Sequence, residues 1–79
     1  MQHQYKIEAF WDREALVWVA ESADILGLVT EADTLEKLTD KLKQMIPELL
    51  IANHSISTDS QKIISFELIT HRQELIQVA

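Results

Sequence analysis

The feature that most constrains the fold is the stretch of residues 16–35, which joins two apolar runs, the chain's only glycine and a helix start without a linker. Gly27 follows Ser22 and Asp24, residue types whose side chains can bond local backbone, and glycine adopts positive φ without steric cost. A turn is therefore expected at Gly27. The residues on either side of it are predicted to be strands, and the second strand leads directly into a helix.

Apolar and polar residues alternate over residues 5–12, which is typical of a half-buried strand. One face carries Tyr5, Ile7, Ala9 and Trp11, and the other carries Lys6, Glu8, Phe10 and Asp12. The polar segment 12–15 separates this strand from the next by the length of a hairpin loop, so the two are expected to be antiparallel neighbours. Residues 15–21 are apolar on both faces, which predicts a central strand covered on each side. Residues 28–32 complete an antiparallel three-stranded meander.

An amphipathic helix follows the meander. Its apolar residues recur at intervals of three and four and form one stripe that is expected to pack on the sheet, made of Leu35, Leu38, Leu42, Met45, Ile46 and Leu49. Asp33 as N-cap would form a capping box with Glu36, and Thr34 is the competing cap. Pro47 lacks a backbone donor, so the helix is expected to end near residue 46, to kink, or to restart with Pro47 in a first turn.

The rest of the chain returns to the sheet. Residues 52–61 have loop composition, and residues 62–70 alternate as a fourth strand, with Ile64, Phe66 and Leu68 on one face. Residues 71–78 form either a short fifth strand or a continuation of the fourth. The predicted class is α+β, in the order β-β-β-α-β, with one or two strands after the helix.

Length and charge restrict the possible roles. A chain of 79 residues permits one domain with a small core. Its net charge of −6, from 13 acidic and 7 basic residues, disfavours binding to phosphate backbones and favours a basic protein partner, although acidity also serves solubility alone. The absence of cysteine excludes disulfides and thiolate metal sites. No signal peptide or membrane span is evident, so a cytoplasmic protein is expected.

No catalytic, cofactor or metal residues are predicted. His3, His54 and His71 lack partners at ligand spacing. The acidic pairs Asp12 with Glu14 and Glu31 with Asp33 are suited to a hairpin and to a helix start, which explains them without a bound cation. A single glycine cannot build a phosphate-binding loop, and no serine lies in a nucleophile motif. Core packing is the favoured role of Trp11 and Trp18 over that of interface anchors.

The order of residues resembles a known family over nearly the whole chain. Its most specific part is the segment 27–31, Gly-Leu-Val-Thr-Glu, followed by Asp33, Thr34 and Leu35. This pattern is similar to the HicB-like antitoxin superfamily, in particular to a single-domain branch of uncharacterised proteins. Ala32 stands where the wider family usually has glycine.

The resemblance implies a partial RNase H-like fold and a single HicB-like domain over residues 1–79. Better-known members cover the active-site face of HicA-type RNA-cleaving toxins, and many carry an additional C-terminal DNA-binding module. This chain ends after its last predicted strand, so neither a separate DNA-binding domain nor operator binding is expected. It also lacks the carboxylate cluster of an RNase H, so nuclease activity is not expected of this chain.

Two functional hypotheses follow. The first is a non-enzymatic, antitoxin-like module that masks a small basic toxin, with Asp12, Glu14, Glu21 and Asp24 as the candidate contact residues. The second is a self-associating regulatory or scaffold domain, a homodimer or higher homo-oligomer, in which the apolar strand 63–69 lies at a sheet edge. A metal-dependent hydrolase is the least favoured class.

Overall fold

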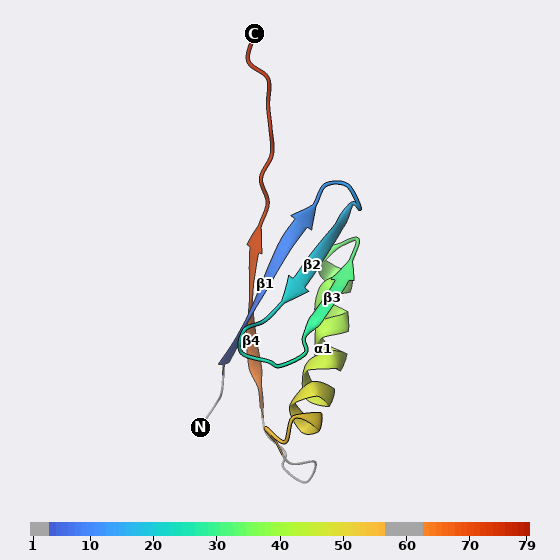
Figure 1. The fold of residues 1–79 in the computed structure, drawn as a ribbon, viewed down its shortest axis with the longest axis vertical. Helices are drawn as coiled ribbons and strands as arrows, with labels where there is room; N and C mark the ends of the chain where they lie inside the picture. The colour runs from blue at the N-terminus through green and yellow to red at the C-terminus, as the bar shows by residue number, and fades with distance from the viewer. Residues whose placement is uncertain (1–3, 57–62) are drawn as a thin grey trace.

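The computed structural model describes residues 4–56 and 63–79, which form a four-stranded sheet and one helix (Figure 1). The elements are β1 (Gln4–Asp12), β2 (Val17–Glu21), β3 (Val29–Ala32), α1 (Leu35–Ala52) and β4 (Ser65–His71). The predicted α+β class and the order β-β-β-α-β are confirmed. No helix in the described part of the chain is both long and apolar enough to cross a membrane.

The sheet is mixed, with the strand order β3-β2-β1-β4. The predicted antiparallel meander is confirmed, because β1 pairs with β2 and β2 with β3 in antiparallel fashion. β4 lies at the edge and pairs in parallel with β1. The helix returns the chain to the end of the sheet at which β1 and β3 begin, so β4 runs in the direction of both.

The core lies between α1 and one face of the sheet. The helix contributes four buried residues at intervals of four, Leu38, Leu42, Ile46 and Leu50. The facing sheet positions include the buried alanines at positions 9, 20 and 32, whose small side chains let the helix lie close to the strands. The predicted stripe is confirmed, with Leu50 as a further member. Leu35, Met45 and Leu49 are partly buried at its margins.

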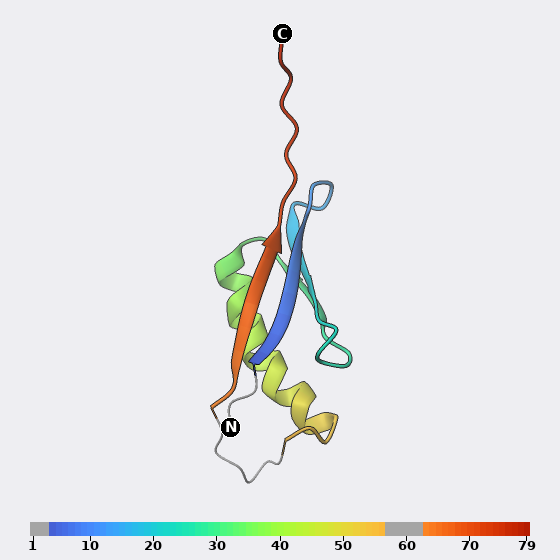
Figure 2. The ribbon, with the colours of Figure 1, turned by 90° about the vertical axis from the view of Figure 1, so that its left-hand side faces the viewer.

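Two local predictions about the strands are corrected. β2 begins at Val17 rather than at residue 15, because Asp12 Oδ1 accepts from the backbone N–H groups of Glu14 and Ala15 and lengthens the turn. Leu16 takes a left-handed φ of 59° in this turn. β2 was also expected to be covered on both faces. It is covered on one face only, because α1 lies on a single side of the sheet (Figure 2).

Two details of the helix also differ from the leading expectations. Thr34 is the N-cap rather than Asp33, since the Thr34 hydroxyl accepts from the backbone N–H of Lys37 at 3.1 Å. The Asp33 carboxylate instead pairs with the Lys37 ammonium at 3.2 Å. The helix continues through Pro47 to Ala52, with Pro47 on the exposed side.

The chain leaves the sheet as an extended segment. Residues 72–79, called the C-terminal arm below, contain no helix or strand and project away from the body (Figures 1 and 2). The alternative of a fifth strand is therefore wrong, and the fourth strand ends at His71. Much of the expected loop 52–61 and the expected strand start at residue 62 lie outside the described residues. The molecule measures 60 × 22 × 19 Å.

Candidate interaction surface

The sheet face turned away from α1, called the open face below, is the main candidate for a functional surface. Pairing and alternation place five apolar residues from all four strands on it, the apolar strip: Phe10, Val17, Val19, Val29 and Ile69. Phe10 is 41% exposed and Val29 is 67% exposed. No described element covers this strip, and exposed apolar side chains gathered on one face are typical of a protein interaction site.

Carboxylates lie both among and around the residues of the apolar strip, since Glu8 and Glu21 stand in one row between Ile69 and Val29. The acidic rim consists of the exposed carboxylates that share the open face by strand pairing, Glu8, Asp12, Glu21, Glu31 and Glu67, and Lys6 lies on the same face beside Glu67. Glu8 and Glu21 lie directly opposite each other on neighbouring strands. Like charges in this position repel, so the sheet holds an unfavourable pair at its surface. Such a pair is favourable once a cation from a partner lies between the two carboxylates.

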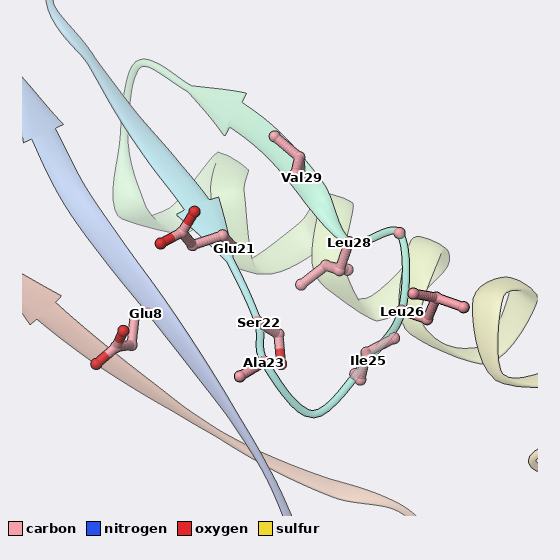
Figure 3. Close-up of a pocket in the computed structure, with 9 residues that line it drawn as sticks. Glu8, Glu21, Ser22, Ala23, Ile25, Leu26, Leu28 and Val29 are labelled. Atoms are coloured by element: carbon pink, nitrogen blue, oxygen red, sulfur yellow. The ribbon is translucent and has the colours of Figure 1, made fainter.

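A hollow lies beside this pair. It is lined by Glu8, Glu21 and Val29 and by residues 22, 23 and 25–28 of the connection between β2 and β3. Figure 3 shows the two carboxylates on adjacent strands. Gly27 takes a φ of 85° in this connection, which confirms the predicted turn. Leu26 in the same connection is 79% exposed. The hollow therefore presents carboxylates and an apolar side chain together.

A histidine and an aromatic ring border the rim on the β4 side. The His71 ring stacks on Phe10 with ring centroids 4.7 Å apart. Its Nε2 lies 3.7 Å from Glu8 Oε1, within ion-pair distance when the imidazole is protonated. The sheet register thus places the His71 ring against both Phe10 and Glu8. Among the described residues, no cluster of three or more His, Cys, Asp or Glu side chains is suited to a metal ion.

The four predicted contact residues do not form one patch. Asp12 and Glu14 lie at the β1–β2 hairpin, whereas Glu21 and Asp24 lie at the opposite end of these strands. Asp12 supports its own turn through backbone hydrogen bonds. Asp24 likewise accepts from the backbone N–H of Lys6 at 2.8 Å, which ties the β2–β3 connection to β1. Of the four, Asp12 and Glu21 lie on the open face, at opposite ends of the β1–β2 pair.

Sequence reasoning missed Glu8, Glu31, Glu67 and the apolar strip as parts of one surface. The alternation places Glu8 and Phe10 on a common face, so their shared position could have been predicted from the sequence. Their grouping with Glu21 depends on the register, because Glu8 pairs with Glu21 only in the register set by the hairpin turn. The inclusion of Glu67 depends on the edge position of β4.

The tryptophans lie on the other face, at the hairpin end. Trp18 is buried, and Trp11 is partly buried against it with ring centroids 5.4 Å apart, which confirms their predicted packing role. The Arg72 guanidinium lies 4.3 Å from the Trp11 ring centroid. Arg72 Nε also donates to Glu74 Oε1 at 2.6 Å, and this hydrogen bond, with the charge of Arg72, lowers the pKa of Glu74.

The chain belongs to a family described as DUF1902, a domain of unknown function, whose sequence model matches residues 4–78. A similar solved structure is the crystal structure of the hypothetical protein TTHA1013 from the extremely thermophilic bacterium Thermus thermophilus. The two chains are 42% identical, the match covers 94% of this chain and 100% of that chain, and the TM-score is 0.73. No curated protein matches the chain.

Proposed function

We propose that this member of the DUF1902 family is a non-enzymatic protein-binding module that holds a small basic protein against its open face. The observation that carries the proposal is the direct opposition of Glu8 and Glu21 beside an uncovered apolar strip. A face on which exposed carboxylates alternate with exposed apolar side chains offers a partner both apolar area to bury and charges to pair.

The charge of the surface selects the kind of partner. The acidic rim adds to a net charge of −6, so a cationic protein is attracted at a distance and oriented as it approaches. A lysine or arginine placed between Glu8 and Glu21 would also remove the repulsion within that pair. The apolar strip then supplies the burial that keeps the complex together.

The more specific form of the proposal is an antitoxin. The resemblance to the HicB-like superfamily, with its partial RNase H-like fold, suggests that the basic partner is a HicA-type RNA-cleaving toxin in the cytoplasm. The order of three meander strands, one helix and one strand supports this interpretation. In this form the open face, rather than the scattered acids of the turns, covers the toxin.

Co-expression with a small basic HicA-type protein encoded next to this chain's gene, where there is one, tests the proposal. The wild type is expected to co-purify with this protein and to relieve the growth arrest that it causes. Glu21→Lys is expected to weaken the complex by at least about tenfold, because it places a cation against a cationic partner. Asp40→Lys is the matched control, since it changes the net charge equally on the exposed side of α1.

Two results would contradict the proposal. The first is a wild type that forms no complex and gives no relief. The second is equal loss of binding in both variants, which would mean that the partner responds to overall charge and not to the open face.

A second candidate function is a self-associating regulatory or scaffold domain. It is favoured by the position of β4, an edge strand whose outer side has no strand partner among residues 4–56 and 63–79. Light scattering on the purified chain tests this candidate, and a strict monomer at all concentrations contradicts it.

A further inference from the structure

The C-terminal arm carries apolar side chains that nothing in the described part of its own chain covers. Leu75 is 73% exposed, Ile76 is 87% exposed and Val78 is 83% exposed. These residues follow β4 in an extended path (Figure 1). If the alternation of β4 continues, Ile76 and Val78 lie on the same side as Phe66. The arm therefore has the side-chain pattern of a strand without a neighbouring strand.

Two contacts hold the base of the arm. Arg72 lies over the Trp11 ring, on the helix side of the sheet as the alternation requires. Arg13 Nη2 donates to the backbone carbonyl of Gln73 at 2.6 Å. These contacts direct the arm straight on from β4, and a reversal onto its own strand would need a tight turn at these residues. A fixed direction also lowers the entropy lost when the arm binds.

The two edges of the sheet differ in how well they are protected. β3 has four residues, and its Glu31 carbonyl accepts from the Lys41 ammonium. β4 has seven residues and contains no proline and no lysine, which are common means of blocking an edge. Its outer backbone groups have no strand partner among the described residues of the single chain. β4 is therefore the edge that can accept another strand.

A hollow beside β4 suits the apolar residues of the arm. It has a volume of about 120 Å³ and lies between α1 and the β4 side of the sheet, lined by Leu42, Lys43, Ile46, Pro47, Ile64 and Phe66. An engineered cavity of about 150 Å³ holds benzene, so one aliphatic side chain is enough to fill this hollow. Phe66 and Leu68 are only partly buried because α1 contacts β2 and β3 rather than β4.

We propose that two copies of this chain form a two-fold dimer in which the arm of each copy adds to the free edge of the other's β4 as an antiparallel strand. The seven arm residues 72–78 match the seven residues of β4 in length. When the two-fold axis passes at His71, Ile76 lies opposite the partner's Phe66. Opposite residues of an antiparallel pair point to the same face, so both side chains lie on the helix side. Ile76 then enters the hollow, and the two sheets become one.

This inference rests on the self-association candidate and is independent of the partner proposed for the open face. The arm adds at an edge of the sheet, with its apolar residues on the helix side, so the open face stays accessible. Main-chain hydrogen bonds supply the affinity in such strand addition, and alternate side chains in pockets supply the register.

Light scattering over a range of concentrations provides the first test. The wild type is expected at about twice the chain mass of 9.1 kDa. Ile76→Asp is expected to weaken the dimer by at least about tenfold, because it would remove the aliphatic side chain and bury a carboxylate in a hollow whose lining is apolar except for Lys43. Leu26→Asp, at a comparably exposed apolar residue far from the arm, is the control and should remain a dimer. A monomeric wild type, or a dimer that Ile76→Asp leaves intact, overturns the inference.

Engineered cysteines provide the second test, because the chain contains no native cysteine. In the proposed register Ser65 lies opposite Gln77 of the other copy, at a Cα separation of about 5 Å that suits a disulfide. The double variant Ser65→Cys with Gln77→Cys should form a covalent dimer on mild oxidation. Ser65→Cys with Ile76→Cys, whose side chains point to opposite faces, should not. Equal cross-linking of both pairs contradicts the register.

Discussion

Gly27 is a residue whose backbone conformation, rather than its surroundings, restricts substitution. Its φ is 85°, and an added Cβ would meet only Leu49 Cδ2 at an ordinary 3.7 Å. Gly27→Ala is therefore expected to lower the free energy of unfolding by about 1–2 kcal/mol through left-handed backbone strain alone. Denaturant unfolding measures this, with Leu26→Ala as an exposed neighbouring control. A change no larger than that of the control would contradict the backbone explanation.

Glu74 is the residue whose titration reports on the base of the arm. Its hydrogen bond to Arg72 and the charge of Arg72 lower its pKa. The pair therefore stabilises the folded protein at pH values above the ordinary carboxyl pKa. This stabilisation is lost as the pH falls through the lowered pKa of Glu74. Arg72→Gln should raise the pKa of Glu74 towards its ordinary value, as followed by NMR titration of the side-chain carboxyl. An unchanged midpoint would show that Arg72 does not hold this carboxylate in solution.

At the scale of the element, the start of α1 distinguishes two neighbouring polar residues. Thr34 accepts from the backbone N–H of Lys37, whereas Asp33 makes an exposed ion pair with the Lys37 side chain. Thr34→Ala is expected to lower the free energy of unfolding by about 1 kcal/mol. Asp33→Ala should cost less, since exposed ion pairs contribute about 0–1 kcal/mol. Thermal unfolding of both variants shows which of them loses more stability. A larger loss in Asp33→Ala would identify Asp33 as the cap.

The elements themselves could be predicted from the sequence because their patterns are local. Alternation over residues 5–12 and the stripe from Leu35 locate a strand and a helix, and Gly27 locates the turn between two more strands. The parallel pairing of β4 with β1 could not be predicted, since the alternation of a strand does not depend on its neighbour. The roles of Asp12 and Asp24 could not be predicted for a related reason, because their hydrogen-bond partners are known only once the turns are formed.

At the scale of the whole molecule, the charges on the open face are expected to lower the free energy of unfolding of the protein. Glu8 and Glu21 repel across the strand pair, and replacing one charge relieves this. Glu21→Lys should raise the free energy of unfolding by about 0.2–1 kcal/mol while it weakens partner binding. Denaturant unfolding compares it with Asp40→Lys. A stability gain confined to Glu21→Lys supports a surface kept for binding, and an equal gain in both points to net charge instead.

The one-sided sheet also makes this chain a useful starting point for engineering. All of the buried hydrophobic core belongs to the helix side, whereas the apolar strip and acidic rim contribute little to it. Side chains at these open-face positions can therefore be exchanged without repacking the interior, with coupled effects at Phe10 and Val19, which lie opposite each other. A library randomised at Phe10, Val19 and Val29 should retain the fold in most of its members, so a cysteine-free domain of 79 residues would serve as a scaffold for selecting new binding proteins.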